Sequence, residues 1–320
     1  MFQRNVNIFP APGIEGSIAS MNPVATIDAG PGGLTAGTSG VAVGRFAWIT
    51  YAVAGGPGVA SNASPTAPAV PDGFVANEQQ ALITVWLGDA TLVVPAGLPV
   101  TLFGRGDFWA KSVYAEAAIG QKVFANLYSG RVLGAAAGSF PTLSFGSSAQ
   151  FTASVPANSN TMTVSAVASG VLAVGQLVTG PGIPQNTYIE SLGTGTGSTG
   201  TYFLSQYPPI ACSGAFSSQT PDGLGGAVGT ASFATNVMTV TGVTSGAFAA
   251  GQLIQSAGVA AGTYITSLGT GTGGTGTYNL STSPGTIAAQ AVSASSWIET
   301  PFYVNSPGNI GDVIKIGVRN

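Results

Sequence analysis

Histidine is absent from this sequence, cysteine occurs once, and only 6% of the 320 residues are charged. Without histidine the chain lacks the commonest general base and the commonest metal ligand, so no Ser–His–Asp or Cys–His arrangement can form. Cys212 stands alone in an apolar stretch, which predicts a small buried hydrophobe and excludes an intrachain disulfide. We therefore expect no catalytic residue, no cofactor and no metal ion, and a protein that is not an enzyme.

Positive charge is also scarce. The net charge of −3 provides no basic field to hold nucleic acid. The longest apolar stretch, Ala81–Phe103, is interrupted by Asp89, Pro95 and Pro99, which disfavour a lipid-facing helix. No apolar run follows Met1, so we expect no secretory signal and a product made in the cytoplasm. A weakly charged surface favours burial in an assembly, because a free monomer with few charges has low solubility.

Glycine is abundant, with 48 copies, and short segments of alternating apolar and polar residues predict an all-β fold. A hairpin is predicted where Gln121–Tyr128 is followed by Ser129-Gly130 and a second short strand. Alternation of Ile314, Ile316 and Val318 predicts a final strand near the C-terminus. Further strands are predicted at Phe46–Tyr51, Ala81–Leu87, Thr91–Val94 and Val100–Phe103.

The middle of the chain contains a tandem repeat with a constant offset of 76 residues, as in Asn160 and Asn236 or Gly175 and Gly251. A match without gaps indicates two copies of one structural module. Each copy is predicted to consist of β-strands, since Met238 and Val240 alternate with threonines. We place the two modules at residues 150–216 and 226–292.

The cations divide the chain into two environments, because all eight Lys and Arg residues lie at or before Arg131 or at Lys315 and Arg319. The final strand therefore resembles the N-terminal block, and we infer that it pairs back into that block. The predicted architecture is a discontinuous β-barrel or β-sandwich base, residues 41–140 plus 295–320, with the two repeat modules inserted. Residues 1–40 are read either as an extended arm that docks on a neighbouring subunit or as a loop-rich start of the base.

Each module contains a GxGxxG string, for example Gly271, Gly273 and Gly276. A dinucleotide site needs a helix after the glycines, whereas a strand is predicted here, so we interpret the strings as turns. Asp107 and Glu116 are the carboxylates considered for a glycosidase without histidine, although a surface or turn ion pair beside Arg105 is the favoured interpretation. The repeat tyrosines could form a sugar-binding face, but alternation favours buried positions for Tyr202 and Tyr278.

Several strings in the two charged parts of the chain resemble the structural cement or decoration proteins of tailed bacteriophages. They are Gly16–Pro23, Ala29–Leu34, Val43–Trp48, Phe74–Leu82, Val93–Val100, Gly106–Trp109, Ala118–Ala125 and Gly311–Ile316. The resemblance covers about residues 1–135 and 295–320. It implies a homotrimer that binds between major capsid protein subunits on the exterior of the virion and stabilises the expanded shell.

From the resemblance and the charge pattern we expect a capsid or subunit interface that includes a small set of apolar and basic side chains. These are Phe2, Arg4, Phe9, Arg45, Arg105, Lys111, Lys122 and Arg131. The expected partners are the major capsid protein and further copies of this chain, with neither nucleic acid nor membrane. The alternative is a tail or surface protein whose Gly/Thr-rich modules bind a host receptor or a host-surface glycan.

Overall fold

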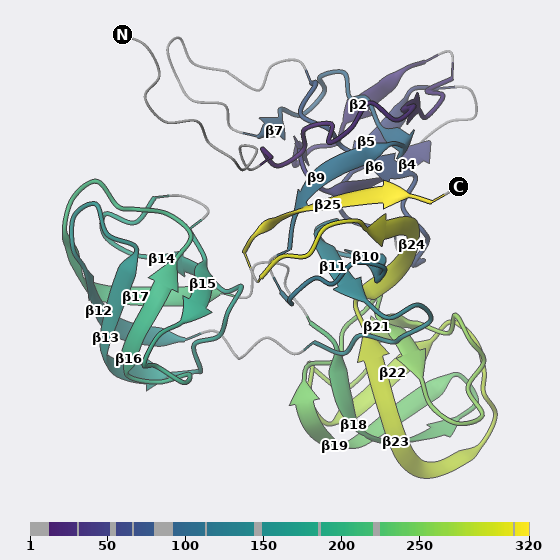
Figure 1. Ribbon diagram of the computed structural model, residues 1–320. Helices are drawn as coiled ribbons and strands as arrows, with labels where there is room; N and C mark the ends of the chain where they lie inside the picture. Colours follow the sequence, from purple (N-terminus) through teal and green to yellow (C-terminus); the bar gives the residue numbers. More distant parts are fainter. Residues whose placement is uncertain are drawn as a thin grey trace, which may run out of the picture.

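The computed structural model describes residues 13–30, 32–51, 56–65, 67–79, 92–112, 114–143, 149–184, 187–219, 225–309 and 311–319. Every regular element in these ranges is a β-strand, which confirms the predicted all-β class. The described residues contain no helix with the length and apolarity that crossing a membrane requires. Figure 1 shows a body that contains both the early strands, such as those labelled β2 and β4, and the last strand, labelled β25, with two separate β-rich bodies beside it.

The body that we call the base is built from two main sheets and one short strand pair. The first sheet has the order β1 (Ala25–Thr26), β8 (Phe103–Arg105), β6 (Gly73–Phe74), β4 (Phe46–Tyr51), β5 (Gly58–Ser61) and β2 (Leu34–Ala36). The second has the order β11 (Val132–Ala135), β10 (Lys122–Asn126), β24 (Trp297–Val304), β25 (Val313–Val318) and β9 (Asp107–Lys111). The short pair is β3 (Val41–Ala42) with β7 (Val93–Val94).

Aromatic side chains fill the space between the two main sheets. Phe108 of β9 lies at the centre, with its ring centroid 5.0 Å from that of Phe74 and 5.5 Å from that of Phe103. Phe302 of β24 and Phe46 of β4 join them, with centroids 5.3 Å apart. Because side chains alternate across a strand, each sheet contributes one apolar face to this core. The stacked pair of Phe74 with Phe108 and the tilted and edge-on pairs around it are favourable beyond the area that they bury.

The C-terminal strands complete the second sheet. β24 pairs antiparallel with β10, and β25 pairs antiparallel with β9. The predicted hairpin is confirmed, since β10 and β11 are antiparallel neighbours. The chain thus leaves this sheet after β11 and returns to it at β24, and both repeats lie between these two strands.

The described part of the N-terminal segment is integrated into the base. Gly16 N donates to the carbonyl of Trp109 at 2.7 Å, and Ala19 N donates to that of Asp107 at 2.8 Å. These bonds cover the edge of β9 that β25 leaves open, an edge that would otherwise present unpaired amides. Residues 13–40 therefore pair within their own chain, whereas Phe2 and Phe9 lie outside the described residues.

Two strand predictions in the base need correction. The predicted strand Val100–Phe103 is wrong as a strand, because β8 begins only at Phe103. Val100 and Leu102 are nevertheless buried and form single backbone bonds, such as Val100 N to the Leu34 carbonyl at 3.0 Å. Of the described residues in the prediction Thr91–Val94, Val93 and Val94 form a strand and Leu92 does not, whereas Thr91 and the prediction Ala81–Leu87 lie outside the described residues.

The two repeats have the same strand order. The first, called module 1, has the order β14 (Leu177–Thr179), β17 (Cys212–Gln219), β12 (Gln150–Val155), β13 (Thr161–Ser169), β16 (Gly200–Leu204) and β15 (Ile189–Leu192). The second, called module 2, has the order β20 (Leu253–Gln255), β23 (Ile287–Ser295), β18 (Ala227–Ala234), β19 (Val237–Gly246), β22 (Gly276–Leu280) and β21 (Ile265–Leu268). Each encloses its own apolar core.

Hydrogen bonds between the outer strands close each module into a small barrel. In module 1, Leu177 forms a bridge with Tyr188, and Val178 N donates to the Thr187 carbonyl at 2.8 Å. In module 2, the equivalent bridge joins Leu253 to Tyr264. Closure removes the exposed strand edges that many proteins protect with charged residues. It explains how modules with almost no charge can present stable β-structure.

The glycine strings serve the packing of one tyrosine in each barrel. The Tyr278 hydroxyl donates to the Gly274 carbonyl at 2.6 Å and accepts from Gly273 N at 3.0 Å. A Cβ atom at Gly271 would lie 2.4 Å from the Tyr278 ring, so only glycine allows the loop to wrap around it. Tyr202 is held in the same way in module 1. The predicted turns followed by strands, and the buried positions of both tyrosines, are confirmed.

Candidate functional site: a basic cleft between the base and module 1

The structure brings three of the predicted interface cations together. Arg45, which precedes β4, Lys111 at the end of β9 and Arg131, which precedes β11, line one cleft of about 540 Å³. The far wall comes from module 1, with Tyr188 as its largest side chain. Glu15 of the N-terminal segment is the carboxylate in this lining. These residues are distant in sequence and meet because β4, β9 and the β10–β11 hairpin belong to neighbouring sheets of the base.

The ring of Tyr188 in module 1 lies beside two of the basic side chains of the base. Lys111 Nζ lies 4.9 Å from the centroid of the Tyr188 ring, and Arg131 Cζ lies 5.9 Å from it. Cations at such distances are attracted to the negative face of an aromatic ring. Two of the cations that the sequence assigned to a capsid contact therefore also hold a module of their own chain.

Burial and charge act against each other in this cleft. Burial raises the pKa of Glu15, and attraction to Arg45, Arg131 and Lys111 opposes that rise. Burial likewise lowers the pKa of Arg131, and the Glu15 carboxylate opposes this. The pKa of Tyr188 is raised by burial, with Lys111 acting in the other direction. The groups thus stabilise one another's charged forms at a place where water is partly excluded.

A buried aromatic cluster next to the cleft fixes module 1 to the base. It contains Tyr188 from module 1 together with Tyr114, Phe124, Leu133 and Trp297 from the base. The Tyr114 and Trp297 rings meet edge to face, with centroids 5.3 Å apart. Tyr114 also packs against Gly175, where a Cβ atom would lie 2.9 Å from the ring. Module 1 is therefore held by aromatic packing as well as by charge.

Module 2 is attached through the equivalent loop but a different partner. The Tyr128 hydroxyl donates to the Ala250 carbonyl at 2.7 Å, next to Gly251, which corresponds to Gly175 of module 1. Tyr264, the counterpart of Tyr188, is only half-buried and lies outside the aromatic cluster. The two modules thus share a fold and a docking loop but differ in how much of the base they engage.

Two further predicted interface cations lie elsewhere on the base. Lys122 Nζ is 3.7 Å from Glu299 Oε1 and 4.0 Å from the Tyr303 ring centroid, and Arg319 Cζ lies 4.7 Å from the same centroid. Arg105 is exposed at the end of β8, beside Asp107. Arg4, like Phe2 and Phe9, falls outside the described residues. The predicted set therefore does not form one surface.

Asp107 has a structural role. Its carboxylate accepts hydrogen bonds from Ser20 Oγ at 2.6 Å and Asn22 Nδ2 at 2.8 Å, and it lies 3.3 Å from Lys315 Nζ. Arg105 lines the same small hollow as this carboxylate, and the ion pair with Lys315 forms across the β9–β25 ladder. Glu116 lines a different hollow, so the two carboxylates considered for glycoside hydrolysis do not face each other across one pocket.

Acidification is expected to destabilise the base through Asp107. Burial disfavours its ionised form, but the hydrogen bonds from Ser20 and Asn22 and the charge of Lys315 outweigh this and lower its pKa. A carboxyl whose pKa is lower in the folded state contributes stability above its unfolded pKa of about 4, and this contribution is lost as the pH falls. We expect Asp107→Asn to reduce the free energy of unfolding at pH 7 by about 1–3 kcal/mol. Because the variant has no carboxyl at this position, its stability is expected to fall less between pH 7 and pH 3 than that of the wild-type protein. Denaturant midpoints between pH 3 and pH 7 measure this, and Glu116→Gln, at an exposed position, is the control. If stability falls between pH 7 and pH 3 by the same amount in Asp107→Asn as in the wild-type protein, the assignment of this acid sensitivity to Asp107 is wrong.

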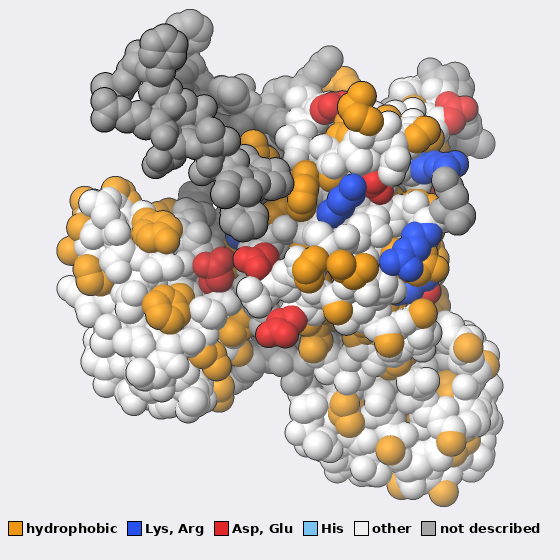
Figure 2. Space-filling view, viewed as in Figure 1, with side chains coloured by type: hydrophobic (Ala, Val, Ile, Leu, Met, Phe, Trp, Pro, Cys, Tyr) orange, Lys and Arg blue, Asp and Glu red, His pale blue; other side chains and the backbone are white. Residues whose placement is uncertain are grey.

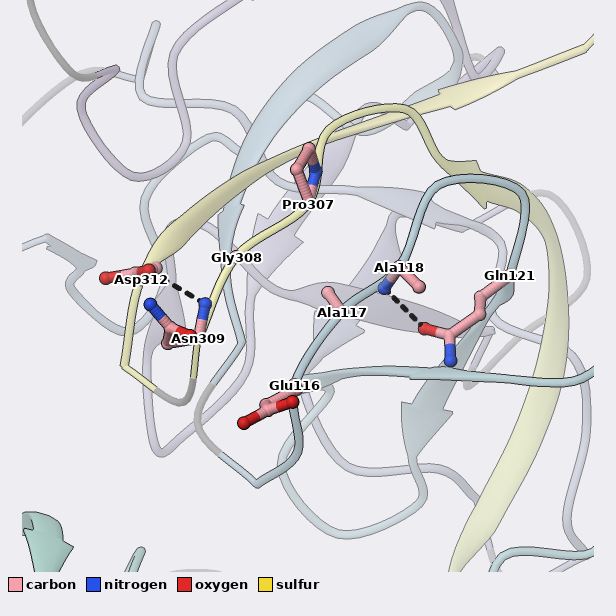
Figure 3. A pocket seen from close by; sticks show the side chains of 8 residues that line it. All are labelled: Glu116, Ala117, Ala118, Gln121, Pro307, Gly308, Asn309 and Asp312. Carbon is pink, nitrogen blue, oxygen red and sulfur yellow. Dashed lines mark hydrogen bonds between the residues drawn. The ribbon is translucent and has the colours of Figure 1, made fainter.

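The hollow that contains Glu116 is lined by the loops between β9 and β10 and between β24 and β25 (Figure 3). Asn309 N donates to Asp312 Oδ2 at 2.8 Å, and Ala118 N donates to Gln121 Oε1 at 2.9 Å. These bonds shape the loops themselves. Within the described ranges no group of three or more potential ligands could hold a metal ion.

Charge is confined largely to the base. Figure 2 shows Lys and Arg side chains on the base only, while the visible faces of both modules are mainly neutral. Glu15 and Tyr188 were not predicted as members of the cleft, because no local pattern marks them. Their role depends on contacts between segments far apart in sequence.

The sequence matches the family described as XM1 gp53 minor capsid protein over residues 2–195. The match spans more than half of the chain and includes most of module 1, whereas the resemblance drawn from single strings covered about residues 1–135 and 295–320. No curated protein matches the sequence. With its all-β base and two neutral barrels, the chain belongs to the XM1 gp53 minor capsid protein family and is a structural protein of a phage capsid.

Proposed function

We propose that the protein is a non-enzymatic cement protein of the capsid exterior. It is made in the host cytoplasm, binds as a homotrimer between major capsid protein subunits and stabilises the expanded shell. The observation that carries the proposal is the match to a minor capsid protein family. Phe2, Arg4, Phe9 and Arg105 are proposed to contribute to contacts with the shell or between subunits.

The distribution of charge supports this role. Every Lys and Arg residue in the described ranges lies in the base, so the base is the part suited to an acidic shell surface, and the neutral modules are proposed to project from it. A rigid trimer makes several such contacts at once, and simultaneous contacts raise the overall affinity without a strong individual one. Binding to the assembled shell and not to its dissociated subunits stabilises the shell by mass action.

Expanded capsids that lack the protein provide the test. After mixing, we expect the protein to sediment with the capsids and to raise the temperature and the guanidinium concentration at which the shells break. Unexpanded capsids are the control and are expected to retain less protein. Light scattering is expected to give the mass of a trimer. A monomer that expanded capsids do not retain would refute the proposal.

A second function, binding of a host-surface glycan by the modules, is favoured by a difference between the repeats. Tyr207 and Ile210 of module 1 are each 63% exposed. The equivalent positions in module 2 are Ser283 and Thr286. Exposed aromatic rings pack against the apolar faces of sugars, so module 1 is the candidate. Adsorption to host cells that is lost on Tyr207→Ser would support this function, and unchanged adsorption would exclude Tyr207 from it.

A further inference from the structure

The basic cleft has the features of a receptor for a negatively charged segment. Counted over the described residues, its lining contains three cations and one carboxylate, a formal excess of two positive charges. Three of only eight Lys and Arg residues in the whole chain gather there, in a protein whose net charge is negative. Such a concentration of like charge raises the electrostatic energy unless a counter-charge is present. Glu15 supplies one negative charge, so a ligand that brings further negative charge would be attracted to the cleft.

The walls of the cleft supply hydrogen-bonding capacity as well as charge. Arg45, Lys111 and Arg131 are each partly exposed to solvent, so an incoming group can reach the cleft. Arginine offers a planar fork of donors that matches a carboxylate in two parallel hydrogen bonds. The hydroxyl of Tyr188 is buried in the same wall and interacts with Lys111. A carboxylate bound among these groups would be a suitable acceptor.

The shape of the cleft favours a short protein segment over nucleic acid. A volume of about 540 Å³ accommodates a few side chains. Binding to a nucleic acid backbone needs cations spread along a track, since each phosphate contact contributes separately to affinity. Here the cations converge, and the two barrels beside the base carry none.

We propose that this cleft binds an acidic segment of a neighbouring shell subunit, with its carboxylates on Arg45 and Lys111. The inference rests on the proposed cement function and adds the chemistry of the partner. Tyr188, Ser205 and Gln206 of module 1 form one wall, so the receptor is incomplete without that module. Module 1 is then part of the shell contact, and module 2 is not.

A binding experiment with the full-length protein tests the cleft directly. Tetraglutamate is titrated at low salt, with tetraglutamine and a short oligothymidine as competing probes. We expect only tetraglutamate to bind, and we expect Arg45→Gln and Lys111→Gln each to weaken it about tenfold. Lys122→Gln removes the same charge outside the cleft and is expected to change the affinity less than about twofold. Both cleft substitutions are at partly exposed positions, and thermal unfolding verifies that the variants fold.

The outcomes separate the cleft from the cement function. The inference is overturned if tetraglutamate does not bind, if oligothymidine binds more tightly, or if Lys122→Gln weakens binding as much as Arg45→Gln. Retention on expanded capsids is then measured with the same variants. Loss of both tetraglutamate and capsid binding in Arg45→Gln supports the inference. If Arg45→Gln loses tetraglutamate binding but is fully retained on capsids, the cleft is not the shell contact, and the proposed cement function is unaffected. If the wild-type protein binds tetraglutamate but no capsid, the cement function fails, and with it the assignment of the segment to a shell subunit.

Discussion

Replacing Phe108 with alanine is expected to destabilise the base by about 3–5 kcal/mol, as large-to-small changes of buried aromatic residues do. Phe108 is fully buried and contacts Phe74 and Phe103 of the first sheet and Phe302 of its own sheet. Its removal leaves a cavity where the two sheets meet, and the surrounding strands are paired on both sides and cannot collapse into it.

Tryptophan fluorescence makes this prediction specific to the base. All four Trp residues lie outside residues 150–292, and the core of module 2 contains none, so Trp fluorescence reports mainly on the base and on its contact with module 1. Phe233→Ala removes an equally buried ring from the core of module 2 and is the matched control. We expect Phe108→Ala to lower the Trp-detected denaturant midpoint and Phe233→Ala to leave it unchanged, although calorimetry should show a destabilised transition. If both variants shift the Trp signal equally, the three bodies unfold as one unit and the assignment of separate cores is wrong.

Tyr188→Ala is expected to detach module 1 from the base. The substitution removes the module's aromatic ring from the buried cluster that contains Trp297, and it deprives Lys111 and Arg131 of the ring that they face. The lost burial amounts to about 3 kcal/mol, with about 0.5–1 kcal/mol more for each cation. The barrel itself is expected to remain folded, because its core residues are unchanged.

The readout is the environment of Trp297. We expect a red shift of its emission in Tyr188→Ala, because detachment of module 1 admits water to the cluster, and faster hydrogen exchange along the contact. Tyr264→Ala makes the same change at the same repeat position in module 2, where the ring lies outside the cluster, and no shift is expected. A red shift in Tyr264→Ala of equal size would mean that the effect is not local to the module 1 contact.

The local features of the fold could be predicted from the sequence. A constant offset of 76 residues fixed the equivalence of the two modules, and alternation identified Tyr202 and Tyr278 as buried. Barrel closure could not be predicted, because the bridge between Leu177 and Tyr188 depends on how the whole sheet curls. No periodicity encodes such a contact.

The residues of the candidate site could likewise be predicted only in part from the sequence. The sequence predicted Arg45, Lys111 and Arg131 as interface residues from the resemblance and the charge pattern, but it gave no reason to expect them in one cleft with Glu15. It also gave no reason to expect an ion pair between Asp107 and Lys315, 208 positions later in the chain, because only the nearby Arg105 was considered. Neighbours in sequence were favoured because nothing in the residues specifies which strands lie side by side.

The first and last long strands of each barrel are hydrogen-bonded neighbours, β12 with β17 and β18 with β23. The chain therefore enters and leaves each barrel at one place, and adding or losing a whole barrel leaves the ends that must be joined close together. Module 1 packs against the base through Tyr188, whereas the equivalent Tyr264 of module 2 lies outside the aromatic cluster. Insertion or removal of a second barrel therefore requires little rearrangement of the base, and a repeat with a constant offset of 76 residues is what duplication of one module would produce.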